Sequence, residues 1–206
     1  MTAPKDLLVL VADYNAEAAV NALLARWHAI GICELSADVF VHLHRDPGVW
    51  AESEKYLRPL QADYSFALVV MDREGSGEDT LSSEEMELRL EARLEAAGWT
   101  GRCSAVVIDP ELDRWVWSVS PNVEKVIRWN DESGMREWLR NRGFNFDEHG
   151  KPLRPKEALE AVLFHAKRVR NSNLYRDIAM KVSLLRCDDR AFVKLRTTLQ
   201  DWFGAR

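Results

Sequence analysis

The sequence predicts an α/β protein with a parallel four-stranded sheet, flanking helices and a helical C-terminal region. Three observations lead to this prediction. Four short apolar runs alternate with segments of helical spacing, the first and third of these runs are apolar at consecutive positions as in strands buried on both faces, and no convincing strand follows Pro110. The chain has 206 residues, of which 47% are hydrophobic and 30% charged, which is enough for one large domain with its own core.

The four strands are the apolar runs, and acidic or turn-forming residues follow each of them. They are predicted over residues 7–13, 38–44, 64–71 and 104–108. The second run is closed by Asp46-Pro47-Gly48, whose residue types favour a turn. Because helices separate the strands, we expect right-handed crossovers and a parallel sheet.

Apolar residues at steps of three or four predict the helices. In the first part of the chain they are expected over 15–30, 50–60 and 82–97. After Pro110, helical spacing is found over 112–119, 123–129, 135–142, 155–169, 174–185 and 190–202. We therefore divide the chain into an α/β domain over 1–120 and a helical region over 121–206 that packs on it.

Charge is distributed unevenly along the chain. Residues 1–150 hold 15 Lys and Arg against 27 Asp and Glu, a net charge of −12, whereas residues 151–206 hold 13 against 6, a net charge of +7. An acidic body that holds a cation, beside a basic tail that contacts phosphate, fits this asymmetry. Simple attraction between the two parts fits it equally well.

The location is expected to be cytoplasmic, without contact to a membrane. The longest apolar runs are far shorter than the roughly 20 residues of a membrane span. The N-terminal segment lacks the pattern of a signal peptide. The three cysteines are far apart and lack zinc-site spacing, so neither a disulfide framework nor a zinc centre is indicated.

Acidic residues gather where the predicted strands end. They are Asp13 after the first strand, Asp72 and Glu74 after the third, and Asp109, Glu111 and Asp113 after the fourth. Because the carboxyl ends of parallel strands meet at one edge of the sheet, we expect these side chains to converge. Asp72 and Glu74 are expected to bind Mg²⁺ or Mn²⁺, which prefer hard oxygen ligands. Asp109 and Glu111 are interpreted instead as caps of the following helix.

In this order the residues resemble the Toprim fold of topoisomerases, primases and overcoming-lysogenization-defect nucleases. Asp13 and Glu17 are similar to two acids four residues apart after the first strand of small bacterial members. The run Asp72-Arg73-Glu74 resembles the DxD-type motif after the third strand, and Pro110, Asp113 and Trp115 resemble a pattern after the fourth. The resemblance covers roughly residues 6–120.

The resemblance implies a Mg²⁺-dependent nuclease or phosphotransfer enzyme. In such an enzyme Asp13 and Glu17 are the catalytic residues, and Asp72, Glu74 and Asp113 hold the metal. Cations on the C-terminal helices are expected to contact nucleic-acid phosphates, unless they simply form a solvated face. They are Lys167, Arg168, Arg170, Arg176 and Lys181.

The end of the chain is similar to the ends of small proteins from methylation-associated anti-phage defence systems. The similar stretches are residues 184–192 and 199–203. This implies nucleic acid and other defence-system proteins as partners, and it leaves the oligomeric state and the substrate open.

Two further functions are compatible with the residues. The first is a catalytically degenerate Toprim-like module that binds nucleic acid or a partner protein without cleaving, which is favoured by aspartate at position 13 and by Tyr14 in place of the usual glycine. The second is a receiver-like phosphoacceptor with Asp72 phosphorylated, which ranks last because no paired acid stands beside Asp13 and no fifth strand ends in lysine. The motifs for ATP hydrolysis, dinucleotide binding, zinc proteolysis and serine hydrolysis are absent from the sequence.

Overall fold

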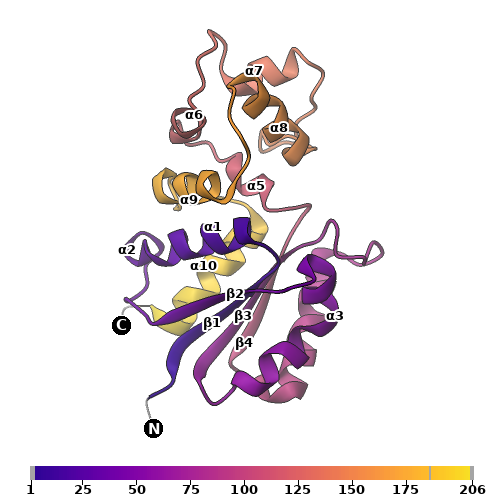
Figure 1. The fold of residues 1–206 in the computed structure, drawn as a ribbon, viewed down its shortest axis with the longest axis vertical. Coiled ribbons are helices and arrows are strands. Elements are labelled where there is room, and N and C mark those ends of the chain that lie inside the picture. Colours follow the sequence, from indigo (N-terminus) through magenta and orange to yellow (C-terminus); the bar gives the residue numbers. More distant parts are fainter. Residues whose placement is uncertain (1–2, 186, 205–206) are drawn as a thin grey trace.

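The computed structural model describes residues 3–185 and 187–204 and confirms the predicted α/β architecture (Figure 1). Its strands are β1 (Lys5–Val11), β2 (Ala37–Val41), β3 (Tyr64–Asp72) and β4 (Cys103–Ile108). They form one parallel sheet in the order β2-β1-β3-β4. The two inner strands, β1 and β3, are the apolar runs that the sequence marked most clearly.

Helices connect the strands and then form the whole C-terminal region. In the first part of the chain they are α1 (Tyr14–Leu24), α2 (Trp27–Ile30), α3 (Arg45–Leu57) and α4 (Ser83–Leu94). After β4 follow α5 (Asp113–Val116), α6 (Asn122–Ile127), α7 (Met135–Arg140), α8 (Pro155–His165), α9 (Ser172–Lys181) and α10 (Arg190–Phe203). In Figure 1, α6, α7 and α8 form the top of the molecule, and α5 and α9 lie between them and the sheet.

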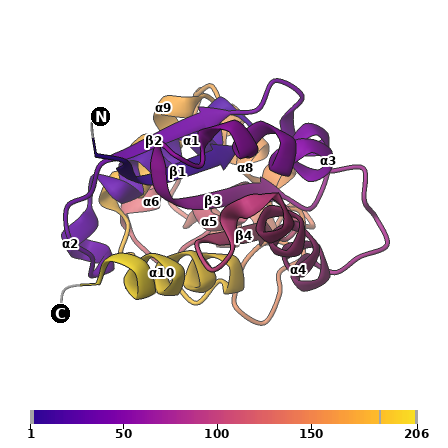
Figure 2. The ribbon, with the colours of Figure 1, turned by 90° about the horizontal axis from the view of Figure 1, so that it is seen from below.

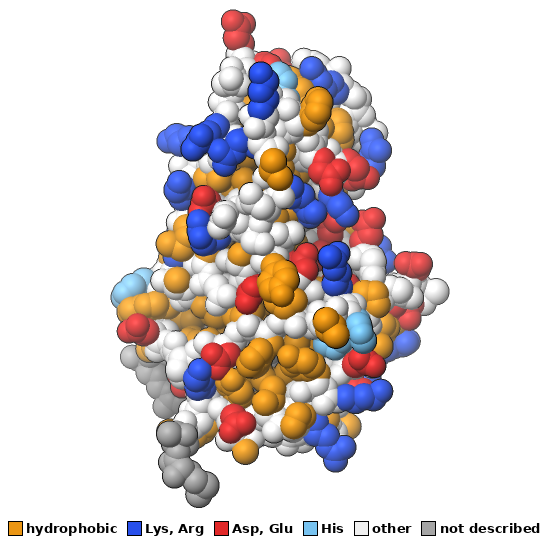
Figure 3. Space-filling model, in the orientation of Figure 1, with side chains coloured by type: hydrophobic (Ala, Val, Ile, Leu, Met, Phe, Trp, Pro, Cys, Tyr) orange, Lys and Arg blue, Asp and Glu red, His pale blue; other side chains and the backbone are white. Residues whose placement is uncertain are grey.

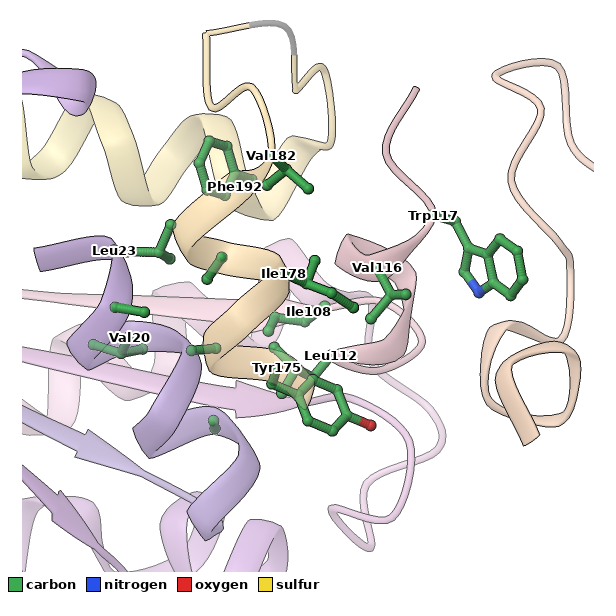
Figure 4. Packing of buried hydrophobic residues seen from close by; sticks show 14 of the residues in the cluster. Val20, Leu23, Ile108, Leu112, Val116, Trp117, Tyr175, Ile178, Val182 and Phe192 are labelled. Atoms are coloured by element: carbon green, nitrogen blue, oxygen red, sulfur yellow. The ribbon is translucent and has the colours of Figure 1, made fainter. Parts of the chain in front are cut away.

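The alternation of side chains along the strands divides the interior into two apolar clusters. Leu8 and Leu10 of β1 pack with residues of α3 and α4 on one face. Leu7 and Val9 belong to the larger cluster on the other face, which α1, α9 and α10 share. Figure 2 shows α10 and α4 beside the sheet, and Figure 4 shows side chains of α1, α9 and α10 entering one cluster. The larger cluster therefore contains residues from both predicted parts of the chain.

Helix α10 also stacks directly on the sheet. The ring of Trp202 lies 4.6 Å from that of Phe66 on β3, and Phe203 meets the same ring edge-on at 5.3 Å. At the end of α10 the carbonyl of Phe203 accepts a hydrogen bond from the backbone N–H of Cys33, 2.9 Å away. These contacts hold the C-terminal end of α10 against β3 and the segment before β2.

A buried carboxylate, Asp189, fixes the beginning of α10. It accepts hydrogen bonds from Arg114 Nε at 3.0 Å, Trp115 Nε1 at 2.9 Å, Lys151 Nζ at 3.1 Å and the backbone N–H of Phe192 at 3.3 Å. Asp189 and Lys151 are both almost fully buried. A single side chain thus joins α10 to α5 and to the loop that precedes α8.

One predicted turn is helical in the structure. The run Asp46-Pro47-Gly48 lies in the first turn of α3, which begins at Arg45 rather than near residue 50. Proline is well tolerated there because the first N–H groups of a helix have no partner within the helix. Gly48 permits the close approach, since a Cβ at this position would lie 2.2 Å from His42 Nδ1.

Within the described part of the chain, every helix is too short or too polar to cross a bilayer.

Candidate functional site

The carboxyl end of every strand leads to an acidic side chain, and these side chains influence one another. We call them the acidic cluster: Asp13 after β1, Asp46 after β2, Asp72 at the end of β3, and Glu111 and Asp113 after β4. The negative charges of the other four all raise the pKa of Asp72. Of the acids that the sequence predicted to converge at this edge of the sheet, Asp13, Asp72, Glu111 and Asp113 thus act on one another.

Asp72 lies at the centre of the acidic cluster. Loss of hydration, followed by the charges of Asp46 and Asp13, raises its pKa well above the usual range. Its Oδ1 accepts a hydrogen bond from the backbone N–H of Leu112 at 2.9 Å. Its own backbone N–H donates to Asp46 Oδ1 at 2.8 Å, so the end of β3 is joined to the first turn of α3 through the two aspartates.

Two neighbours of Asp72 have raised pKa values as well, and these lie near neutrality. Burial, together with the charge of Asp13, raises the pKa of Asp46 to about 6. Burial and the charge of Asp113 raise the pKa of Glu111 to about 7, although Lys156 Nζ lies 3.8 Å from its carboxylate. Such values are typical of groups that exchange a proton near pH 7 or that are neutralised by a cation.

Asp13 is the N-cap of α1. Its Oδ1 accepts hydrogen bonds from the backbone N–H groups of Asn15 and Ala16, each at 2.9 Å. This is the ordinary stabilising role of an aspartate at the start of a helix. Glu17 is half-buried in the first turn of the same helix, and its side chain makes no hydrogen bond or ion pair among the described contacts.

Asp113 is paired with a cation rather than facing open space. Its Oδ2 lies 2.6 Å from Arg170 Nη2, and its Oδ1 accepts a hydrogen bond from the Tyr175 hydroxyl at 2.7 Å. The side chain is 1% exposed. Burial and the charge of Asp113 raise the pKa of Tyr175, and Asp113 also raises that of Arg170 against the effect of burial. These contacts show that Asp113 fixes the position of the Arg170 side chain.

Glu74 lies at the rim of the acidic cluster. Its side chain is exposed, and its backbone N–H donates to the Pro110 carbonyl at 2.9 Å. The charge of Glu74 is one of the causes that raise the pKa of Glu111. The aspartate and the glutamate of the Asp72-Arg73-Glu74 motif thus differ in burial, with Asp72 in the cluster and Glu74 in solvent.

The five predicted nucleic-acid residues do not share one helix face. Lys167, Arg168 and Arg170 lie in the connection between α8 and α9, because α8 ends at His165 and not at residue 169. Arg176 is on α9 and pairs with the adjacent Asp177 at 3.1 Å. Lys181 is the last residue of α9, with an exposed side chain.

Two members of the acidic cluster were not among the residues predicted for the site. Asp46 was interpreted as part of a turn, and Glu111 as a helix cap. The signal for Asp46 is present in the sequence, since it is the first acid after the second strand, just as Asp13 and Asp72 close the first and third. Applying the strand-end rule to all four strands would have included it.

Among the residues that the structure describes, no three His, Cys, Asp or Glu side chains are arranged so as to hold a metal ion.

Comparison with other proteins adds no family to this geometry. No family model, no curated protein and no solved structure matches the chain.

Proposed function

We propose that this protein carries out Mg²⁺- or Mn²⁺-dependent phosphodiester cleavage or phosphoryl transfer at the acidic cluster. The observation that supports the proposal is the position of Asp72, whose carboxyl is raised in pKa by four other acids at the carboxyl edge of a parallel sheet. Acids gathered in this way need either shared protons or a cation to relieve their repulsion.

The donor chemistry fits a hard divalent cation. Asp72 and Asp46 would supply the one or two carboxylates that Mg²⁺ uses together with water and substrate phosphate. A site of this kind does not require three protein ligands. When bound, the cation would polarise a phosphate oxygen and neutralise developing charge. Glu74, at the rim, is the ligand that the sequence pairs with Asp72.

The remaining roles follow from the surroundings of each side chain. Glu111, whose pKa is about 7, would accept a proton from an attacking water near neutral pH. Arg170, held by Asp113 and Tyr175, would meet the negative charge of a phosphate. Asp13 and Glu17 would orient the water from the start of α1.

The first test is calorimetric titration of Mn²⁺ into the wild-type protein, Asp72→Asn and Asp79→Asn. Asp79 is an exposed acid in the loop after β3 and serves as the control for loss of one carboxylate near the site. We expect saturable binding in the wild type and Asp79→Asn, and none in Asp72→Asn. Absence of binding by the wild type at millimolar Mn²⁺, or equal binding by Asp72→Asn, would contradict the proposal.

A second candidate is a module that binds nucleic acid or a partner protein without cleaving. Two observations favour it, since Asp13 is used as a helix cap and Asp113 is paired with Arg170. Incubation of single- and double-stranded DNA and RNA with Mn²⁺ separates the two. Binding without cleavage of any of them would support the module, and cleavage that Asp72→Asn abolishes would support the enzyme.

We further propose a cytoplasmic location, and we propose membership of an anti-phage defence system, with partner proteins from it, on the basis of the sequence resemblance. Co-purification with other defence-system proteins from cells would test the second.

A further inference from the structure

The C-terminal end of α8 carries an exposed aromatic side chain beside three cations. Phe164 and Leu43 are each 87% exposed, and no other large apolar side chain among the described residues is more exposed. It borders an open surface hollow of about 700 Å³ between α7 and α8. The other side chains of the hollow that matter here are Trp138, Arg142, His165, Lys167 and Arg168. None of the described residues that line it is acidic.

Aromatic rings form the floor of this hollow. The ring of Trp138 lies 4.8 Å from that of His165 and 5.3 Å from that of Trp129. The Arg142 guanidinium lies 3.5 Å from the Trp138 ring centroid, which holds this cation at the surface. The nearby Asp131 pairs with His165 at 3.2 Å.

The two other cations have no acidic partner. Over the described residues, neither Lys167 nor Arg168 has a carboxylate within ion-pair distance. Their charges are therefore available to a ligand. On the face drawn in Figure 3, Lys and Arg side chains also gather along the left side of the helical upper part.

Lys167 occupies a backbone position that favours glycine. Its φ of 53° is left-handed, and it closes α8 with hydrogen bonds from its own N–H to the Phe164 carbonyl and from the Arg168 N–H to the Leu163 carbonyl. Glycine is the usual residue at this point of a helix end because it adopts the left-handed region without strain. Lysine at this position has a strained backbone, and a function of its side chain would explain why the chain has lysine here instead of glycine.

We infer that this hollow binds single-stranded nucleic acid, with a base stacked on Phe164 and phosphates on Arg142, Lys167 and Arg168. Every unpaired base has a flat apolar face that an exposed ring can cover, and the backbone supplies the anions that unpartnered cations attract. A duplex hides its base faces within the helical stack, so it offers Phe164 much less.

The inference extends the proposed function by naming its substrate class. Two residues beyond Arg168, Arg170 is paired with Asp113 of the acidic cluster. The segment from Phe164 to Arg170 spans at most roughly 20 Å when extended. A nucleic-acid strand that is bound in the hollow and continues along this segment would reach the acidic cluster, which is proposed to act on phosphodiesters.

The test is fluorescence anisotropy of the full chain with a labelled oligothymidylate of about 12 nucleotides in EDTA. We expect Phe164→Ala to weaken binding about ten-fold, the effect of losing one stacked base. Leu88→Ala on α4 removes another exposed apolar side chain and should leave binding unchanged. A duplex of the same length should bind more weakly than the single strand.

Salt dependence tests the cations separately from folding. Each phosphate contact on a single strand contributes about 0.7 to the slope of log affinity against log salt, so Lys167→Gly should lower the slope by about that amount. Glycine suits the backbone of this position, so this variant is not expected to unfold the protein. Lys55→Gln on α3 removes an exposed charge elsewhere and should not change the slope.

Three results would overturn the inference: no binding of the oligonucleotide, equal binding of duplex with no effect of Phe164→Ala, or equally effective competition by polyglutamate, which would indicate an acidic protein partner. Because the assay contains no divalent cation, its outcome is independent of the Mn²⁺ titration. Binding in EDTA together with failure to bind Mn²⁺ would reject the proposed enzyme and leave this surface intact.

Discussion

Replacing Asp189 with alanine removes the acceptor shared by Lys151, Arg114 and Trp115. Lys151 Nζ lies 3.1 Å from Asp189 Oδ2, and the Lys151 and Asp189 side chains are only 4% and 5% exposed. Arg114 retains a second acid, Asp147, at 2.7 Å, so Lys151 is the group left as an uncompensated buried charge. The perturbation therefore acts on the junction of α10, α5 and the loop before α8.

The magnitude follows from the burial of this pair. Removing one partner of a buried ion pair costs about 3–5 kcal/mol because the remaining charge loses both its hydration and its counter-charge. For a chain of this length each kcal/mol lowers Tm by roughly 2–4 °C, so we expect a fall of about 6–20 °C for Asp189→Ala. The N-cap of α10 is lost as well, since the Asp189 side chain accepts from the Phe192 N–H.

Urea unfolding and thermal melts measure the effect, and Asp188→Ala is the control. The Asp188 carboxylate is 60% exposed and lies 3.3 Å from His149, so its loss should change the free energy of unfolding by less than about 1 kcal/mol. Lys151 and hydrogen bonds outweigh burial and lower the pKa of Asp189 in the folded state. Its contribution is thus present above the usual aspartate pKa and is lost as pH falls through the lowered value.

Equal losses for the Asp188 and Asp189 variants, or a loss below about 1 kcal/mol for Asp189→Ala, would refute the burial argument. If the difference in free energy of unfolding between wild type and Asp189→Ala stayed constant down to strongly acid pH, the assignment of the ion pair would be refuted.

Three further predictions concern the site and the end of α8. In metal-free protein Glu111→Gln should raise the free energy of unfolding by about 3 kcal/mol at pH 8, because the ionised Glu111 carboxylate destabilises the folded state. The gain should vanish as pH falls below about 4.5, and urea unfolding at several pH values measures it. Asp113→Ala should lower Tm in a thermal melt, by less than Asp189→Ala because the Arg170 side chain that loses its counter-charge is 29% exposed, and an unchanged Tm would contradict the pairing. Lys167→Gly should keep the stability or raise it by up to about 1 kcal/mol in the same melt, and a clear loss would show that the left-handed backbone is not strained.

The strands could be predicted because burial on both faces leaves an unbroken apolar run in the sequence. The run from Leu7 to Ala12 and the run from Phe66 to Met71 contain no other residue type and became the two inner strands. The start of the helix over 45–57 differs from the predicted one, since Asp-Pro-Gly has the residue types of a turn and its glycine is required by the close approach to His42, a contact that the local sequence does not indicate.

The site could be predicted only in part, because its acids are local signals whereas their partners are distant in sequence. Asp72 follows directly from a strand end, but the pairing of Asp113 with Arg170 joins residues 57 positions apart. No spacing rule indicates such a pair. Lys167 was expected on a helix, and its left-handed backbone depends on where α8 ends, which periodicity does not locate to a single residue.

The position of α10 has a consequence for the synthesis of the protein. Leu195, Leu199 and Trp202 belong to the cluster on the sheet face that carries Phe66 and Leu68, so this face lacks the part of its cover that α10 supplies until the ribosome has made nearly the whole described chain. The strands are complete much earlier, by Ile108. During the intervening translation the nascent chain presents the part of this apolar face that α10 later covers, and the risk of aggregation is concentrated in that interval.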